Sequence, residues 1–297
     1  MMDGVIVVDK PSGWTSHDVV AKMRRIAQTK RVGHLGTLDP LATGVLPLVL
    51  NGATRLAQFY TSSSKVYEGT IHFGFATDSY DADGAPVGEV REVHPDPEQL
   101  RALMAQFRGT ISQTPPQVSA KKIGGVPAYK LARKNVEVVM KAVEVTVDVF
   151  DLVNLDGAEA KVLVHCSSGT YVRSLAHDLG KALGCGAHLK ALRRLASGDF
   201  SIAQAQTLEA LETLGAENRL AEVLVPAGDL LPEMPSETVD ELTASQIRHG
   251  RSFRVSPFKA IGNAKYVKAL APDGRLLAIG EATLPHLYHP MLVFDAG

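Results

Sequence analysis

The sequence predicts a mixed α/β (α+β) protein with a large first domain and a small β-rich second domain. Helical and strand-like hydrophobic patterns alternate through residues 1–231, whereas short strands separated by glycine-bearing turns follow residue 236. Pro232 and Pro235 mark a linker between the two parts. The 297 residues, of which 45% are hydrophobic, are sufficient for one large core and one small one. We therefore expect domains over 1–231 and 236–297.

The first part of the chain alternates between strand and helix signals. Residues 4–9 predict a short buried strand, and Ser16 is placed to cap a helix whose apolar residues recur at helical spacing. Basic residues occupy the outer side of this helix and the positions after it: Lys22, Arg24, Arg25, Lys30 and Arg31. The next expected elements are a buried strand over 45–50, a short helix to about residue 60 and a strand over 65–75.

The middle of the chain combines regular elements with one irregular basic segment. Asp96 and Pro97 start a helix that Gly109 stops. Residues 113–140 begin with Pro and Gly and continue with lysines and arginines, which favours a basic insertion over an ordinary surface loop. The remaining expected elements are a strand over 161–167, a helix over 170–183 and helix within the acidic stretch 206–231.

Composition excludes several classes of protein. No apolar stretch approaches the roughly 20 residues of a membrane span, and the start of the chain lacks the features of a signal peptide. Cys166 and Cys185 form no C-x-x-C motif or Cys/His cluster, which argues against a disulfide framework and a structural zinc site. We expect a cytoplasmic protein without a membrane partner.

Charge is distributed unevenly along the chain. The formal net charge is −1, but residues 206–241 hold nine acidic residues and one basic residue, so the remainder holds 30 basic and 23 acidic residues. A basic surface that binds a polyanion can therefore coexist with a neutral total. Ordinary solvated surface charge explains the composition equally well.

The segment GHLGTLDPLATG, residues 33–44, is the strongest candidate for a reactive site. Its three glycines and one proline require tight turns and exclude a regular helix or strand. Pro40 biases Asp39 toward an extended backbone, so the carboxylate is held on a stiff loop before a buried strand. The alternative is that Asp39 only caps the following turn.

Arg173 and the segment 77–84 also stand out. Arg173 falls in the first turn of its helix, where a cation opposes the helix dipole, so it needs an anionic partner. A neighbouring surface carboxylate could be that partner. The aspartates of 77–84 suggest an EF-hand calcium loop, but the spacing fails at both ends, and we interpret the segment as a turn.

Several segments together resemble the bacterial tRNA pseudouridine synthase B family. VDKPSGWTSHDVV and RVGHLGTLDPLATGVLPL match its opening, and the later matches are KVY at 65–67, the T-x-D segment at 77–84, PPQVSAK, AYKLAR, GTYVRSLA and AHLKALRR. LTASQIRHGRSF and DGRLLAIGEA resemble a PUA domain, an RNA-binding module. The matches span nearly the whole chain.

This resemblance implies a fold and an activity. The expected fold is a pseudouridine synthase catalytic domain with a largely antiparallel mixed sheet, followed by a PUA-like domain. The expected activity is isomerisation of uridine to pseudouridine at position 55 in the T-arm of tRNA, with base flipping. The enzyme would be a monomer, with no cofactor and no metal.

The resemblance also assigns roles to individual residues. Asp39 matches the catalytic aspartate, and Arg173 matches an arginine that pairs with it and would lower its pKa. Tyr67 would stack on the target base and is a candidate acid or base, although a buried core tyrosine is the alternative. His34 would fill the space that the flipped base leaves, and Leu192 would line the base pocket.

The remaining candidates are RNA contacts. The matched segments suggest contacts from Lys65, Lys121, Lys122, Arg193 and Arg194, and the PUA-like segment suggests Arg248, Arg251 and Arg254. Two other classes stay open on residues alone: a glycoside hydrolase, which normally needs a second carboxylate, and a non-catalytic RNA-binding protein. Loss of product with retained RNA binding in Asp39→Asn would identify the enzyme.

Overall fold

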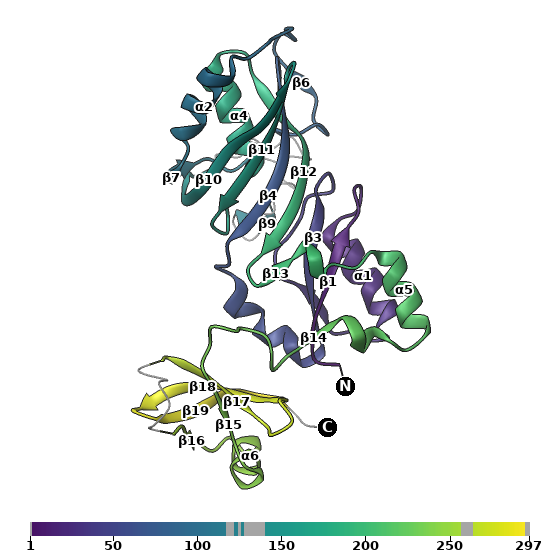
Figure 1. Ribbon diagram of the computed structural model, residues 1–297, viewed down its shortest axis with the longest axis vertical. Coiled ribbons are helices and arrows are strands. Elements are labelled where there is room, and N and C mark those ends of the chain that lie inside the picture. Colours follow the sequence, from purple (N-terminus) through teal and green to yellow (C-terminus); the bar gives the residue numbers. More distant parts are fainter. Residues whose placement is uncertain (1, 117–121, 124–125, 128–139, 257–263, 295–297) are drawn as a thin grey trace.

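A large mixed sheet forms the centre of the computed structural model, which describes residues 2–116, 122–123, 126–127, 140–256 and 264–294. The strands of this sheet are β1 (Gly4–Lys10), β2 (Val32–His34), β3 (Thr43–Leu50), β4 (Lys65–Phe73), β7 (Gly109–Gln113), β10 (Val143–Asp156), β11 (Glu159–Cys166), β12 (Ala187–Ser197), β13 (Phe200–Ser201) and β14 (Leu224–Pro226). Their order is β14-β1-β3-β12-β4-β11-β10-β7, with β13 beside β12 and β2 beside β3 (Figure 1).

The pairing pattern of this sheet confirms the expected mixed, largely antiparallel arrangement. β3 and β12 pair in parallel, through Arg193 opposite Thr43 and Arg194 opposite Gly44. The other described pairs of the sheet are antiparallel. The parallel contact places the end of β12 beside the start of β3, directly after the Asp39 loop.

Two cores lie on opposite faces of β1. Ile6 and Val8 join a cluster that also contains the apolar sides of α1 (Ser16–Ile26), α2 (Pro97–Ala105), α4 (Val172–Leu183) and α5 (Leu208–Ala216). Val5 and Val7 join a second cluster with the 3-10 helix η1 (Asn51–Tyr60) and parts of the C-terminal sheet. Because successive side chains of a strand point to opposite faces, burial on both sides explains the unbroken apolar run.

Helix α1 begins one residue away from the expected cap. Thr15 is the N-cap, and its side chain and Asp18 form a reciprocal capping box. Ser16 is instead buried in the first turn, with its hydroxyl bonded to Leu38. The residue that seemed to cap the helix therefore holds the loop that carries Asp39.

Other boundaries differ for local reasons. β4 ends at Phe73 rather than residue 75 because Gly74 has a φ of 113°. Helix α4 begins at Val172 rather than residue 170. Within the acidic stretch only Leu208–Ala216 is α-helix; Asn218 has a φ of 57°, and β14 then pairs with β1. Tertiary pairing there overrides helical composition.

The C-terminal part is β-rich, as expected. Its elements are β15 (Ser236–Thr238), α6 (Glu241–Arg248), β16 (Phe253–Arg254), β17 (Tyr266–Leu270), β18 (Leu276–Leu284) and β19 (Leu287–Val293), with the sheet order β15-β17-β18-β19-β16. The buried Lys268 ammonium donates to the carbonyls of Gly228 and Leu230 at 2.9 and 2.8 Å, which joins this sheet to the segment just before the linker. The boundaries 1–231 and 236–297 stay a prediction.

Short hairpins complete the described chain. β5 (Ala76–Thr77) pairs with β6 (Pro86–Val87), and β8 (Lys122–Ile123) pairs with β9 (Val126–Pro127) within the basic insertion. Most of that insertion lies outside the described residues. In the described part of the chain, no helix is long and apolar enough to cross a membrane, and no cluster of His, Cys, Asp or Glu is suited to a metal ion.

Candidate active site

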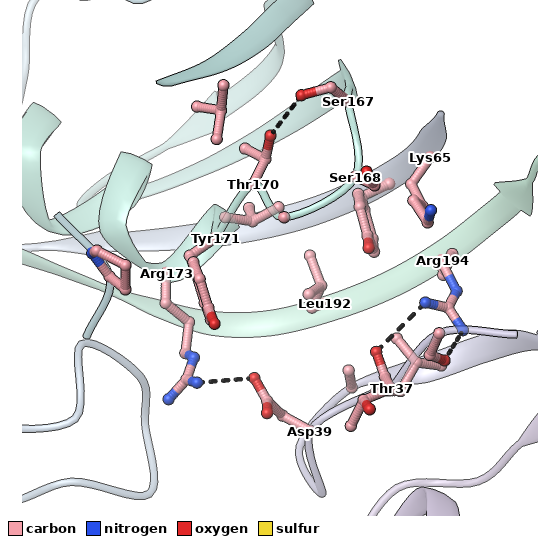
Figure 2. A pocket seen from close by; sticks show the side chains of 18 of the residues that line it. Thr37, Asp39, Lys65, Ser167, Ser168, Thr170, Tyr171, Arg173, Leu192 and Arg194 are labelled. Atoms are coloured by element: carbon pink, nitrogen blue, oxygen red, sulfur yellow. Dashed lines mark hydrogen bonds and ion pairs between the residues drawn. The ribbon is translucent and has the colours of Figure 1, made fainter. Parts of the chain in front are cut away.

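A cavity of about 650 Å³ opens between the Asp39 loop, the start of β4, the loop before α4 and strand β12 (Figure 2). Six of the residues expected to act or bind RNA line it: Asp39, Tyr67, Arg173, Leu192, Lys65 and Arg194. They come from positions far apart in the sequence. The sheet therefore brings the separate motifs together at one place.

The Asp39 loop is held by buried polar groups on its helix side. The Ser16 hydroxyl accepts from the Leu38 amide at 2.8 Å and donates to the Leu38 carbonyl at 3.1 Å. The Lys10 ammonium, which is fully buried, donates to the carbonyls of Trp14 and Pro40 at 2.6 and 3.3 Å. These bonds fix the backbone on both sides of Asp39, so the carboxylate is positioned before a substrate arrives.

Arg194 holds the same loop from the other side. Its guanidinium donates to the carbonyls of Gly36 at 3.0 Å and Val45 at 2.7 Å, and only 1% of the residue is exposed. The adjacent Gly44 has a φ of 95°, and a Cβ there would lie 2.2 Å from the Arg194 carbonyl oxygen. The glycine at position 44 is therefore required by this close approach as well as by its backbone conformation.

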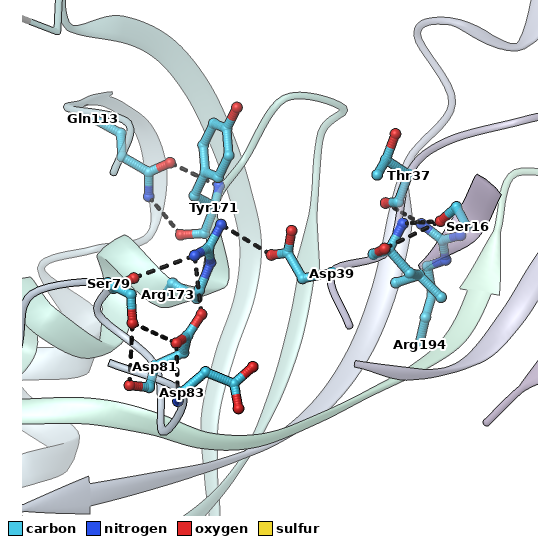
Figure 3. Close-up of polar contacts among 11 residues, drawn as sticks. Ser16, Thr37, Asp39, Ser79, Asp81, Asp83, Gln113, Tyr171, Arg173 and Arg194 are labelled. Atoms are coloured by element: carbon cyan, nitrogen blue, oxygen red, sulfur yellow. Dashed lines mark hydrogen bonds and ion pairs between the residues drawn. The ribbon is translucent and has the colours of Figure 1, made fainter. Parts of the chain in front are cut away.

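Arg173 has the anionic partner that its position in the helix demands. It is the second residue of α4 and is 5% exposed. One terminal nitrogen lies 3.0 Å from an Asp39 carboxylate oxygen, and the other lies 2.9 Å from an Asp81 oxygen. Figure 3 shows the guanidinium between the two carboxylates. The expected pairing of Arg173 with Asp39 is present in the structure.

The sequence reasoning missed Asp81. This carboxylate is 4% exposed, accepts from the Ser79 hydroxyl, and lies behind Arg173 rather than among the described residues that line the cavity. The segment 77–84 is therefore a turn that anchors Arg173. A guanidinium has five N–H donors, so a buried arginine needs more than one acceptor. This requirement could have indicated that Arg173 has a second acidic partner besides Asp39. Because Asp81 lies behind Arg173, it cannot serve as the second carboxylate that a glycoside hydrolase places beside its substrate.

The pKa of Asp39 is raised above its ordinary value. Burial is the largest cause, and the Asp81 carboxylate adds to it, whereas Arg173 opposes both. The expectation that Arg173 lowers the pKa of Asp39 gives the correct sign for that one contribution but the wrong sign for the net shift. The side chain is still 42% exposed toward the cavity, where a substrate can reach it.

Tyr67 lies in the wall of the cavity and is 8% exposed. Burial raises the pKa of its hydroxyl, and the neighbouring Arg194 opposes that rise. The hydroxyl is therefore protonated at neutral pH and can donate a proton or a hydrogen bond. The flat ring, fixed on β4, offers a surface on which a base can stack.

Leu192, Arg193 and Arg194 are consecutive residues of β12, and their side chains have different surroundings. Leu192 lines the cavity, as expected. Arg193 is 39% exposed at its side chain and binds Asp9 through two nitrogens at 2.7 and 3.0 Å. Arg194 is 1% exposed and lines the cavity, so the RNA contacts expected of the two arginines stay predictions. Consecutive residues of a strand point to opposite faces, so two adjacent arginines cannot share one surface.

The remaining candidates lie away from the cavity or outside the described residues. His34 is half-buried in β2, its ring packs edge-on against His17 with centroids 5.7 Å apart, and burial lowers its pKa. It does not belong to the described lining of the cavity. Lys121 lies outside the described residues, and Lys122 is described only as part of the backbone of β8.

The C-terminal arginines lie at the surface of the β-rich part, on α6, on the loop that follows it and on β16. Arg248 forms an ion pair with Glu241 at 2.8 Å, and Arg251 and Arg254 are exposed. Their proposed contacts with RNA stay predictions.

Comparison with known proteins agrees with this geometry. The TruB family pseudouridylate synthase N-terminal domain matches residues 24–172, and the tRNA pseudouridylate synthase B C-terminal domain matches residues 173–232. A tRNA pseudouridine synthase B of Solibacter usitatus is 61% identical over 98% of this chain and 100% of its own length. One from Thermobifida fusca is 45% identical over 95% of each chain.

A solved structure also resembles the whole chain. The structure of an H/ACA RNP bound to a substrate RNA containing 2′-deoxyuridine includes a chain that is 26% identical, with a TM-score of 0.73 over 98% of this chain and 85% of that one. The chain therefore belongs to the TruB family of pseudouridylate synthases and is an isomerase.

Proposed function

We propose that this enzyme converts the uridine at position 55 in the T-arm of tRNA to pseudouridine. The observation that carries the proposal is the Asp39 carboxylate, which is open to the cavity while Arg173 holds it at 3.0 Å. Relatives that match nearly the full chain are named tRNA pseudouridine synthase B. The T-arm position rests on the resemblance of the motifs around Asp39, Tyr67 and Arg173 to that family.

The reaction requires one bond to break and one to form, without a net change in oxidation state. The bond between uracil N1 and C1′ breaks, the uracil rotates, and C5 bonds to C1′ while its proton leaves. Asp39 starts this sequence by attacking C1′, adding to the uracil ring, or removing a sugar proton. Each route needs the ionised carboxylate, which the Arg173 guanidinium stabilises.

The cavity accommodates a base that has left its stack. Tyr67 and Leu192 provide a flat ring and an apolar side chain on neighbouring strands, and these suit the two sides of a uracil. By its position Tyr67 is a candidate acid or base; its raised pKa keeps the hydroxyl protonated, so it serves as a donor, and it can accept the C5 proton only after losing its own. His34, held neutral beside His17, fills the vacated space in the RNA.

The surroundings of the cavity supply the RNA-binding surface. Exposed Arg24, Arg25 and Arg31 lie on or just after α1, which follows the turn bonded to the Asp39 loop. Residues 236–297 act as a PUA-like RNA-binding domain, and 1–231 form the catalytic domain, whose basic segment over about 113–140 is an RNA-binding insertion. The proposed enzyme acts in the cytoplasm, where its tRNA substrate occurs, and acts as a monomer.

Release of tritium from C5-labelled uridine tests the reaction and its position together. The substrate is an unmodified tRNA transcript labelled at all uridines, with no metal or nucleotide added. We expect one equivalent of tritium to be released per transcript. A matched transcript with cytidine at position 55 should release none. Equal release from both transcripts would contradict position 55, and no release from either would contradict the reaction.

A further inference from the structure

Lys65 is a buried cation in the cavity wall that the mechanism above does not use. It is the first residue of β4, is 8% exposed, and lines the same cavity as Asp39. Its ammonium donates to the Ser63 carbonyl. An ammonium has three N–H donors, and in the described part of the chain no other acceptor or carboxylate bonds to this one. A buried cation in this state has capacity for an anionic or carbonyl partner.

The other buried cations described near the cavity, Lys10, Arg173 and Arg194, already have several hydrogen-bond or ion-pair partners. Lys10 donates to the carbonyls of Pro11, Trp14 and Pro40, and Arg194 donates to those of Gly36, Thr37 and Val45. Arg173 is shared between two carboxylates. Lys65 differs from all three, because its one described bond leaves most of its donor capacity directed at the cavity.

Lys65 and Asp39 lie at different ends of the cavity. Figure 2 shows Lys65 on the far side of Leu192 from Asp39. Arg173 and Lys10 are the cations that oppose the rise in the pKa of Asp39, whereas burial and the neighbouring Arg194 lower the pKa of Lys65. The stem of Lys65 runs past the Asp39 loop, since a Cβ at Gly36 would lie 3.9 Å from its Cε. A flat ring between the two ends would meet the carboxylate on one edge and the ammonium on the other.

The reaction generates negative charge on the edge of uracil that is remote from the sugar. When the bond between N1 and C1′ breaks, its electron pair stays on the uracil and is delocalised onto the carbonyl oxygens. If Asp39 instead adds to the ring, the displaced pair is likewise delocalised onto an oxygen. We propose that Lys65 donates a hydrogen bond to a uracil carbonyl oxygen and stabilises this charge, which makes it a further catalytic residue. The proposal rests on the proposed function.

The expected loss of rate follows from other enzymes in which a hydrogen-bond donor stabilises a developing oxyanion. Removing one donor to a developing oxyanion typically lowers a rate by about 10²–10³-fold. Lys65→Met keeps the length of the side chain and removes the donor. We expect the single-turnover rate to fall by about 10²-fold while the dissociation constant for the tRNA transcript stays within about twofold. Lys65→Arg, which keeps the charge, should recover part of the rate.

Substrate modification distinguishes this contact from a purely structural role. Transcripts carry 2-thiouridine or 4-thiouridine at the target position, because sulfur accepts hydrogen bonds more weakly than oxygen. At one of the two positions sulfur should slow the wild type strongly and Lys65→Met much less. Lys190→Met is the matched control, since Lys190 lies on β12, is half exposed and pairs with Glu159. It should behave as the wild type does.

Three outcomes would overturn the proposal. The first is an unchanged single-turnover rate in Lys65→Met, and the second is weaker binding without a change in rate, which would assign Lys65 to a phosphate. The third is an equal thio effect in wild type and variant at both positions. If Lys65→Met unfolds, Lys65→Leu, which also removes the donor, is subjected to the same thio comparison with the same expected result. Failure of the wild type to release tritium would instead contradict the proposed function itself.

Discussion

Replacing Arg173 by Met separates its structural from its catalytic contribution. The guanidinium joins Asp39 and Asp81, and both Arg173 and Asp81 are about 5% exposed or less. Removing one partner of a buried ion pair typically costs about 3–5 kcal/mol, because the other charge stays buried without compensation. Asp39 is left out of this figure because 42% of its side chain is exposed. In a domain of this size, about 3 kcal/mol lowers the melting temperature by about 6–12 °C.

A second substitution tests the cause of this loss. In Arg173→Met/Asp81→Asn the buried charge is gone, so we expect at least half of the lost melting temperature to return. Activity should not return, because Asp39 still lacks its cation. Calorimetric melting and single-turnover tritium release measure the two effects separately. An unchanged melting temperature in Arg173→Met, or a double variant less stable than the single one, would refute the reasoning.

Three further predictions concern the loop and its charges. Because burial raises the pKa of Asp39, activity should be lost as pH falls through a value above the ordinary range of an aspartate. Arg173→Lys weakens the contact that opposes this rise, so it should move the loss of activity to higher pH. A pH–activity profile that is flat down to pH 4 would contradict this expectation. Burial lowers the pKa of Lys10 to about 8 in the folded chain, so above that pH the unfolded chain binds more protons than the folded chain. In urea titrations, the free energy of unfolding of wild type relative to that of Lys10→Met should therefore rise between about pH 8 and 10.5. A difference that stays constant over this range would show that the pKa shift is absent. Gly44→Ala should lower the free energy of unfolding by more than the about 1–2 kcal/mol expected for backbone strain alone, because its Cβ also clashes with Arg194. Gly13 has a φ of 82° and open space where a Cβ would lie, so Gly13→Ala should lose only the strain energy. Equal losses of stability in thermal melts would refute the clash.

Local signals in the sequence were sufficient for the centre of the site. The glycines and proline around Asp39 indicate an irregular, rigid loop, and the position of Arg173 against its helix dipole indicates an anionic partner. Both are properties of short segments. The helices and strands of the first part and the β-rich character of the C-terminal part also follow from hydrophobic patterns within single elements, whereas the mixed sheet was expected only from the family resemblance.

The supports of the site could not be derived in this way because their partners are remote. Ser16 bonds Leu38 across 22 residues, and Arg194 bonds Gly36 across 158. The sequence does not show which buried polar group meets which carbonyl. Asp81 was missed for the same reason, since Arg173 lies 92 residues away from it.

The acidic stretch shows a different limit. Its composition favours one continuous helix, but Leu224–Pro226 pairs with β1 instead, and the helix ends before it. The helical part packs beside α1, where Glu212 pairs with Lys22. The acidic residues therefore partly neutralise the basic helix, a relation that exists only in the folded chain.

The most direct test of the account is single-turnover tritium release from a tRNA transcript labelled only at uridine 55, with wild type compared with Asp39→Asn. The amide has nearly the same shape as the carboxylate and lacks its charge, so RNA binding should be retained. We predict complete release by the wild type and none by the variant, although both bind the transcript with similar affinity. Release by Asp39→Asn at a rate near that of wild type would contradict the assignment of Asp39 as the reacting group.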